Sequence, residues 1–325
     1  METPLVSICA VSFNHAPYIR ECLDHFLAQK TDFPYEILIH DDASEDGTQN
    51  IIREYMGRYP GKVRAILETE NQYSKGISNL SGAFNFPRAG GKYIALCDCD
   101  DYWSDPDKLR IQTEYMEAHP DCMMTVHCAE TVNDKGELIN KNLMRPFRRD
   151  RLLSGSEMVD KAGSFPFASM LLRAEIVREL PDYYTECPVG DRPLELLAAS
   201  RGTVYYFDRP MSVYRFNGKG SWTDSMKTGD LEKKQNEYAE KMRKMYCDFD
   251  RETGGTFHKE AVSASHRLYF LTRVNLRSFS VIYDKKYRKF LKELPVRDRF
   301  FIFLEYKMPG LYQKLQNGYH AVQKK

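Results

Sequence analysis

The sequence is poor in cysteine and has no long apolar run. Only 8 of its 325 residues are cysteine, far too few for a small disulfide scaffold, so we expect reduced thiols in a cytoplasmic protein. No segment approaches the roughly 20 apolar residues of a membrane-spanning helix, and the first residues lack the pattern of a secretory signal. Internal repeats and low-complexity stretches are also missing. What remains is a globular chain long enough to bury a sizeable core.

Several familiar catalytic and metal-binding patterns are absent as well. The chain has no Gly-x-Ser-x-Gly nucleophile elbow and no Gly-x-x-x-x-Gly-Lys-Ser/Thr phosphate loop. None of the histidines before residue 130 has a histidine four residues away. Cys97 and Cys99 lack a second cysteine pair at the spacing of a structural zinc site, so we expect Cys97 to pack within a sheet.

The formal net charge of +1 conceals an asymmetry along the chain. Residues 261–325 carry 14 Lys and Arg against 4 Asp and Glu, whereas the rest carries 33 basic and 42 acidic residues. Aromatic residues are interleaved with the basic ones in this tail. Such a pattern fits a helix lying on an anionic membrane surface, or a helical extension packed on the acidic body or on a second subunit. Nucleic acid is not expected as a partner, because no recognisable binding module is present.

Apolar strands alternate with amphipathic helices through the first half. We expect buried strands at residues 5–11, 35–39, 63–67 and 93–97. Helical spacing of apolar residues follows the first, second and fourth of them. This order predicts an α/β fold with βαβ units, in which ligands bind at the carboxyl ends of the strands.

The second half mixes short strands with helices. A turn at 133–136 predicts a hairpin between strands at 123–132 and 137–140. Further strands are expected at 167–172, 203–207 and 211–215, and helices at 191–200, 231–245 and 258–281.

Acidic side chains gather at the predicted strand ends. Asp98, Asp100 and Asp101 follow the fourth strand, and three carboxylates so close repel one another unless a cation neutralises them, which suits Mg²⁺ or Mn²⁺. A solvated turn is the alternative. Asp41 and Asp42 close the second strand, where one can hold the turn and the other accept from the imide of a nucleobase; alternatively, both serve the loop.

Three blocks in this order and spacing closely resemble the family 2 glycosyltransferases of the GT-A fold. They are residues 8–14 (ICAVSFN), 39–48 (IHDDASEDGT) and 91–101 (GKYIALCDCDD). The resemblance spans roughly residues 4–225 and implies a mixed, mostly parallel sheet flanked by helices. It implies a catalytic domain at 1–228, with a donor half at about 1–102 and an acceptor half at about 103–228. A helical, basic C-terminal extension follows at 229–325.

The resemblance assigns the strand ends to a nucleotide-diphosphate sugar. Asp42 would read the base, uridine being the commonest, with Val11, Phe13 and Asn14 near the nucleoside. Asp98 would contact the donor as well.

The resemblance also assigns the metal and the base. Asp98 and Asp100, with Asp101 beside them, would form the DxD motif that holds Mn²⁺ or Mg²⁺ against the diphosphate. Asp191, which opens a helix, would be the catalytic base that takes the proton of the acceptor hydroxyl in an inverting transfer. Read without the resemblance, Asp191 suits a helix N-cap after Gly190.

The sequence departs from this family pattern at three places. Gly190 stands where many relatives have Glu, residues 83–85 read Ala-Phe-Asn where an Ala-Arg-Asn run is common, and the His that often follows the Tyr-Arg of the last core strand is missing. Arg88 or Lys75 are the candidates to replace the missing Arg.

Three further residues are candidate substrate contacts. Lys219 and Trp222 lie in a loop that could close over the diphosphate, and Trp103 follows the acidic cluster. The two tryptophans could stack on sugar rings or simply pack in the core.

The expected function is transfer of one sugar to a glycan or lipid-linked acceptor in cell-surface polysaccharide synthesis, in the cytoplasm or peripherally at the inner face of the membrane. A sugar nucleotidyltransferase is disfavoured, because residues 12–17 do not form the Gly-rich, Arg-bearing loop of that class. The third hypothesis is an inactive scaffold that binds glycan. A homo-oligomer is compatible with all three.

Overall fold

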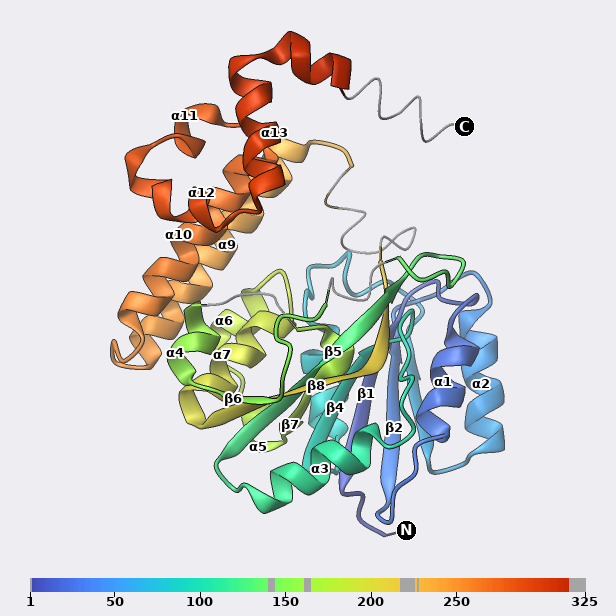
Figure 1. The fold of residues 1–325 in the computed structure, drawn as a ribbon. Coiled ribbons are helices and arrows are strands. Elements are labelled where there is room, and N and C mark those ends of the chain that lie inside the picture. The colour runs from blue at the N-terminus through green and yellow to red at the C-terminus, as the bar shows by residue number, and fades with distance from the viewer. Residues whose placement is uncertain (1, 140–143, 161–164, 217–225, 227, 316–325) are drawn as a thin grey trace.

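The computed structural model describes residues 2–139, 144–160, 165–216, 226 and 228–315. Its centre is an eight-stranded sheet in the order β3-β2-β1-β4-β7-β5-β8-β6 (Figure 1). Its strands are β1 (Val6–Ser12), β2 (Tyr35–Asp41), β3 (Val63–Leu67), β4 (Tyr93–Asp98), β5 (Cys122–Val132), β6 (Arg151–Leu153), β7 (Leu171–Arg173) and β8 (Thr203–Arg215).

The sheet is mixed but mostly parallel. Strands β3, β2, β1 and β4 run parallel, β7 is antiparallel to β4 and β5, β5 and β8 are parallel, and β6 is antiparallel to β8. The central strands are apolar on both faces because helices cover both. Alternate residues of β1 accordingly enter different cores: Ile8 and Ala10 enter one, and Cys9 enters the other.

Helices cover the two faces of the sheet as separate layers (Figure 1). The first core includes α1 (Ile19–Leu27), α2 (Thr48–Arg58) and α3 (Lys108–Ala118). The second includes α4 (Gly155–Asp160), α5 (Glu175–Arg178), α6 (Asp182–Glu186) and α7 (Asp191–Arg201). Short π- and 3₁₀-helical turns, η1 (Ser81–Asn85), η2 (Phe86–Arg88) and η3 (Phe167–Ser169), connect these elements.

The C-terminal region is helical, as the sequence predicts. It comprises α9 (Leu231–Glu252), α10 (His258–Asn275), α11 (Phe279–Ile282), η4 (Lys285–Tyr287), α12 (Arg288–Glu293) and α13 (Val296–Lys307). Residues of α9 and α10, among them Met242, Tyr246 and Ala261, belong to the same core as α7. A third, small core around Phe270 and Phe290 joins the remaining helices. The hydrophobic packing therefore continues across residue 229, where the sequence predicts the start of the extension.

Several predicted elements differ from the structure. The helix expected at 258–281 ends at Asn275, and the separate helix α11 begins at Phe279. Residues 203–207 and 211–215 form one strand, β8. Its register against β5 shifts between His127 and Ala129, where residues 208–211 of β8 form a bulge. The bulge accommodates Pro210, which cannot donate to a regular ladder. Residues 167–169 are a 3₁₀ turn before the short β7. The hairpin turn at 133–136 forms, but the described residues after it pair with β5 through isolated bridges, Leu138 with Val132 and Met144 with Ala129; residue 140 lies outside the described residues.

Candidate active site

The polar ends of β1, β2 and β4 meet at one edge of the sheet. Val11 of β1 is in register with His40 of β2 on one side and with Asp98 of β4 on the other. Ser12 is in register with Asp41. The predicted convergence of these strand ends is therefore confirmed, and Phe13, which follows Ser12, exposes 43% of its surface there.

The loops after β1 and β2 are tied to each other by hydrogen bonds. The amide of Asn14 donates to Ser44 Oγ at 2.8 Å, and the amide of Glu45 donates to Asn14 Oδ1 at 2.9 Å. Asn14 has φ 56°, a left-handed conformation that asparagine tolerates better than most residues. The amide of Ala16 donates to Asp46 Oδ2 at 2.9 Å. These bonds fix the backbone where the nucleoside is expected.

Asp41 and Asp42 each organise a loop. Asp41 accepts from the amide and the hydroxyl of Ser44, at 2.9 and 2.6 Å. Asp42 is 1% exposed and accepts from the amides of Gln72 at 2.7 Å and Tyr73 at 3.1 Å, which holds the loop after β3. The reading of a base by Asp42 stays a prediction. Tyr73, a 48% exposed aromatic residue beside Asp42, was not predicted near the site, because a lone tyrosine in a polar loop carries no pattern.

Phe84 stands where relatives commonly have the arginine of the Ala-Arg-Asn run. It stacks on His40 with ring centres 4.2 Å apart, and burial lowers the pKa of that imidazole. Arg88 donates to the carbonyl of Ile39 at 2.6 Å and to Asn85 Oδ1 at 2.7 Å. Arg88 therefore supports the sheet edge and η1 and does not replace the missing arginine.

Asp98 and Asp100 form a partly exposed pair of carboxylates at the end of β4. Burial, together with the charges of Asp100 and Asp191, raises the pKa of Asp98 to about 8. His15 Nε2 lies 4.0 Å from Asp100 Oδ2. Carboxyl groups are thus concentrated here, and their mutual repulsion disfavours ionisation of Asp98.

Asp101 serves a different purpose from its neighbours. It is 4% exposed, and its Oδ1 accepts from the amide of Arg215 at 2.8 Å. Burial and the charge of Asp100 raise the pKa of this carboxyl well above its usual range. The contact ties the acidic loop to the last residue of β8, so Asp101 has a structural role whether or not it also touches a metal.

Arg215 clamps the acidic loop from the opposite side. Its Nε donates to the carbonyl of Asp100 at 3.0 Å, its Nη1 donates to the carbonyl of Asn133 at 3.2 Å, and its Nη2 contacts Glu21 Oε2 at 3.1 Å. The guanidinium also lies 4.3 Å from the centre of the Tyr18 ring. The sequence gives no signal for this role of Arg215, because its partners are distant in the chain.

Asp191 begins α7, with Gly190 as the N-cap. It is partly exposed, burial raises the pKa of its carboxyl, and its Oδ1 accepts from the amide of Arg192 at 2.7 Å. The charge of Asp191 also raises the pKa of Asp98, so the two carboxyl groups lie close enough to interact. The structure thus brings together two carboxylates that the sequence places far apart.

The residues around Asp191 are held by buried polar contacts. Asn79 donates through Nδ2 to the carbonyls of Tyr184 and Cys187, the latter at 3.1 Å. A Cβ on Gly190 would lie 3.0 Å from Asn79 Oδ1, so the glycine at this position allows the close approach of Asn79. None of these contacts has a local signal in the sequence.

Arg192 anchors the start of α7 to its neighbours. The side chain is buried, and it donates to Tyr246 Oη of α9 at 2.9 Å, to Glu195 Oε2 at 2.7 Å and to the carbonyl of Met158 at 2.8 Å. A buried arginine with this many partners fixes the direction of the helix. The extension thereby helps to position Asp191.

The acidic pair suits a divalent cation that also binds its substrate. Among the described residues, no group of three or more His, Cys, Asp or Glu side chains is arranged to hold a metal ion. Mg²⁺ and its relatives do not need such a cage, because they bind through one or two carboxylates, waters and substrate phosphates. Asp98 and Asp100 offer hard oxygen donors, and a cation would stabilise the ionised form of Asp98 that burial and the neighbouring carboxylates disfavour, so the residues fit.

The remaining predicted contacts fall outside this site or outside the described residues. Trp103 is fully buried; its Nε1 donates to the carbonyl of Ala168 at 2.9 Å, and its ring packs 4.7 Å from that of Phe26. The packing alternative therefore holds for Trp103, and we do not retain it as a substrate contact. Lys219 and Trp222 lie outside the described residues.

Residues 7–177 match the family described as Glycosyl transferase family 2. This stretch covers more than half of the chain and contains the three strand ends. The chain belongs to glycosyl transferase family 2. The predicted family is therefore confirmed.

Several relatives of this family 2 protein share part of its sequence. An uncharacterized protein of Mycobacterium tuberculosis is 33% identical over 222 residues, which are 67% of this chain and 60% of that protein. A Bacillus subtilis glycosyltransferase named for teichuronic acid biosynthesis, TuaG, is 33% identical over 113 residues, 35% of this chain and 42% of its own length. The chain thus spans less than two thirds of these relatives.

Solved structures confirm the GT-A fold. TarS of S. aureus, residues 1–349 in complex with UDP-GlcNAc, superposes with a TM-score of 0.64 at 16% identity, covering 97% of this chain and 91% of that one. The mannosyltransferase PcManGT of Pyrobaculum calidifontis, in complex with GDP-Man and Mn²⁺, gives a TM-score of 0.54 at 16% identity, covering 98% and 84%. The predicted fold class, with its helical C-terminal region, is borne out.

Proposed function

We propose that this chain is a metal-dependent, inverting glycosyltransferase. It moves one sugar from a nucleotide-diphosphate donor, with uridine as the expected base, to a hydroxyl group of a glycan or lipid-linked acceptor in cell-surface polysaccharide synthesis. The family supports sugar transfer, and the structurally similar proteins TarS and PcManGT were solved with UDP-GlcNAc and with GDP-Man and Mn²⁺, respectively. Donor sugar, acceptor and stereochemistry are part of the proposal.

The observation that carries the proposal is the electrostatic link between Asp98 and Asp191. Asp98 and Asp100 make up the candidate metal site, and Asp191 is a separate carboxylate whose charge reaches Asp98. Sugar transfer needs one acidic group to hold the departing diphosphate through a cation and another to take a proton. Two such groups at one sheet edge meet this requirement.

The residues then divide the reaction between them. Asp98 and Asp100 would hold the cation, which as a Lewis acid supplies charge neutralisation to the leaving diphosphate. Asp191 accepts the proton of the acceptor hydroxyl while the hydroxyl oxygen forms a bond to the anomeric carbon of the sugar. The bond from that carbon to the diphosphate oxygen breaks, and its electron pair leaves with the nucleoside diphosphate. Attack opposite the leaving group inverts the anomeric centre.

A donor hydrolysis and binding assay tests the proposal. We expect the chain to hydrolyse at least one UDP-sugar slowly with Mn²⁺, and UDP with Mn²⁺ to raise its melting temperature by mass action. Asp100→Ala should abolish Mn²⁺-dependent UDP binding and leave the fold intact. Asp134→Ala, which removes an exposed acid in the turn at 133–136, is the matched control and should bind like the parent. Undiminished Mn²⁺-dependent binding by Asp100→Ala would refute the metal site.

The same assays separate the base from the metal site. Asp191→Asn should keep UDP affinity within about twofold and lose roughly 10²- to 10⁴-fold in transfer rate, which is the usual contribution of a general base. Near-normal turnover would place the base elsewhere. A chain that binds glycan but neither hydrolyses nor binds any nucleotide sugar would support the inactive scaffold.

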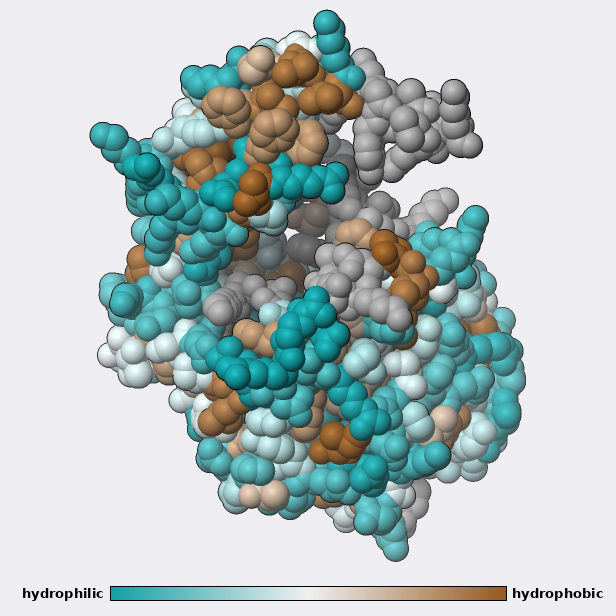
Figure 2. All heavy atoms as spheres, in the orientation of Figure 1, coloured by the Kyte–Doolittle hydropathy of each residue, from teal (hydrophilic) through white to brown (hydrophobic). Residues whose placement is uncertain are grey.

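We also propose that α13 docks on an anionic membrane surface. Val296, Phe300 and Phe303, spaced four and three residues apart, are 73, 53 and 47% exposed, while Ile302 and Leu304 on the same helix are buried. Figure 2 shows apolar side chains gathered over the C-terminal helices at the top of the view. The basic charge of residues 261–325 suits an anionic surface, at about 1 kcal/mol for each basic residue near it. None of the helices that the structure describes is long and apolar enough to cross a membrane.

Vesicle sedimentation tests this docking. The chain should sediment with phosphatidylglycerol vesicles and much less with phosphatidylcholine vesicles. The double substitution Phe300→Ser and Phe303→Ser should reduce sedimentation at least fivefold. The control is Leu152→Ser, which removes a 54% exposed leucine of β6. Equal sedimentation of the parent and the double variant would contradict the proposal, and a concentration-dependent dimer lost in the double variant would indicate a second copy as the partner.

A further inference from the structure

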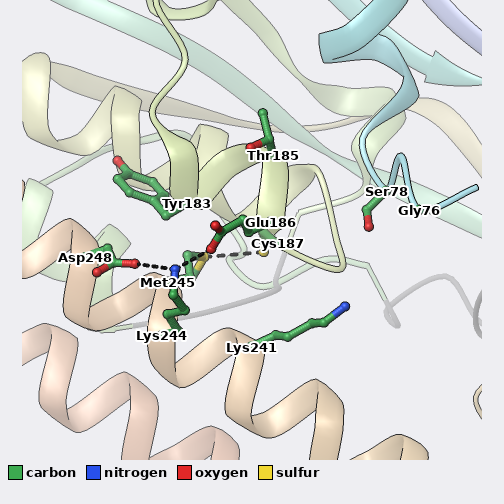
Figure 3. A pocket seen from close by; sticks show the side chains of 10 residues that line it. All are labelled: Gly76, Ser78, Tyr183, Thr185, Glu186, Cys187, Lys241, Lys244, Met245 and Asp248. Carbon is green, nitrogen blue, oxygen red and sulfur yellow. Dashed lines mark hydrogen bonds and ion pairs between the residues drawn. The ribbon is translucent and has the colours of Figure 1, made fainter.

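A cavity of about 370 Å³ lies between α9, the end of α6 and the loop after β3 (Figure 3). Its floor contains sulfur: Cys187 Sγ lies 3.6 Å from Met245 Sδ. Tyr183 and Thr185 line the α6 side, and Ser78 lines the side of the loop. A mixed lining of apolar floor and polar rim is typical of sites that bind small polar ligands.

The cavity is lined by two lysines and two acids. Lys244 forms ion pairs with Glu186 and with Asp248, the latter at 3.2 Å. Lys241 extends away from these acids, toward the side of Gly76 and Ser78 (Figure 3). Within the described part of the chain, Lys241 forms no ion pair, because both acids of the cavity pair with Lys244. Its ammonium is therefore the charge that remains open to a ligand.

The cavity adjoins the segment that carries Asp191. Tyr238 lies one turn before Lys241 on the same helix; burial raises the pKa of its phenol, and the charge of Asp191 raises it further. Burial and Asp191 also raise the pKa of Cys187, while Lys241 lowers it. Asn79, which packs against Gly190, donates to the carbonyl of Cys187 at 3.1 Å. The wall of the cavity is thus continuous with the loop that leads into α7.

We propose that this cavity is the acceptor subsite beside Asp191, and that Lys241 binds a phosphate or carboxylate group of an anionic glycan acceptor. The inference rests on the proposed function, since an acceptor must approach the residue that takes its proton. It goes further by assigning specificity to α9 of the extension. The hydroxyl that reacts would lie toward Asp191, and the anionic group of the same or the next sugar unit would lie toward Lys241.

Binding of defined oligomers tests the inference. The probes are a glycerol phosphate tetramer, a hyaluronan tetrasaccharide and the uncharged maltotetraose, titrated calorimetrically into the full chain saturated with UDP and Mn²⁺. We expect at least one of the two anionic oligomers to bind at least tenfold more tightly than maltotetraose, with an affinity that falls as salt is added. The preferred anionic oligomer also tells phosphate from carboxylate.

Substitutions on α9 assign the effect to Lys241. Lys241→Glu should weaken binding of the preferred anionic oligomer at least tenfold without weakening maltotetraose, and Lys241→Arg should restore most of it. Lys233→Glu, which makes the same charge change at an exposed position outside the cavity, should bind like the parent. Failure of both anionic oligomers to bind, or equal losses in Lys241→Glu and Lys233→Glu, would overturn the inference. If one of these results is obtained and the parent still hydrolyses UDP-sugars, the inference fails but the proposed function stands.

Discussion

Replacement of the buried Lys108 by methionine should stabilise the protein at neutral pH. The Lys108 side chain is fully buried at the start of α3, and its Nζ has no hydrogen-bond partner within the described residues. It lies 4.0 Å from the centre of the Trp103 ring. Burial lowers the pKa of the ammonium from 10.5 to about 7. The protonated form is therefore disfavoured in the folded chain.

The size of the effect follows from this pKa. One pKa unit corresponds to 1.36 kcal/mol, so protonation of the unfolded chain costs the native state about 4 kcal/mol of stability at pH 7. Loss of the contact with the Trp103 ring costs the methionine variant about 2 kcal/mol. Methionine keeps a flexible apolar chain of similar length and carries no charge. We expect Lys108→Met to be more stable by about 2 kcal/mol.

The pH dependence gives the sharper test. The pKa of Lys108 is lower in the folded chain, so between about pH 7 and 10.5 the unfolded chain binds more protons and the stability of the parent rises with pH. Lys108→Met lacks this gain, so its advantage should be largest at pH 7 and below and shrink toward pH 10. Urea unfolding of parent and variant at pH 6, 7, 8 and 9 measures it, with the exposed Lys135→Met as the control. Destabilisation of Lys108→Met at every pH, or an advantage that is independent of pH, would refute the reasoning.

Three further predictions concern the site. Ala43→Gly should stabilise the chain by about 1 kcal/mol in thermal unfolding, because Ala43 has φ 63°, a left-handed conformation that glycine adopts without strain. The control Ala89→Gly, at φ −74°, should destabilise the chain. Equal effects of the two substitutions would contradict this prediction. Gly190→Glu should lower the rate of sugar transfer at least tenfold, because the new side chain displaces Asn79. Adding Asn79→Ala should restore part of the lost rate. A normal rate in the single variant would contradict this prediction. Arg215→Met should lower the free energy of urea unfolding by roughly 2–4 kcal/mol. It should also weaken Mn²⁺-dependent UDP binding, because Arg215 binds the backbone of Asp100. UDP affinity equal to that of the parent would show that this contact does not position the acidic loop.

The order of strands and the position of the acidic clusters could be read from the sequence. Apolar runs such as residues 35–39 and 93–97 match β2 and β4 within one or two residues, because a strand buried on both faces needs apolar residues throughout. The carboxyl ends of parallel strands share an edge, so the convergence of Asn14, Asp42 and Asp98 followed from topology alone. The long strand β8 did not follow, since Pro210 reads as a turn until the bulge opposite β5 is known.

The partners of each side chain were decided only by the tertiary structure. Nothing local distinguishes Asp101, which accepts from Arg215, from Asp98, which shares its electrostatic environment with Asp191. Trp103 and Trp222 had equal claims in the sequence, and only packing placed Trp103 in the core. Sequence determined the fold family, the elements and the edge at which chemistry is expected, because these depend on periodicity and on short motifs. Which carboxylates face one another depends on loops and helix ends that are distant in the chain, and their geometry is fixed only when the two cores close around the sheet.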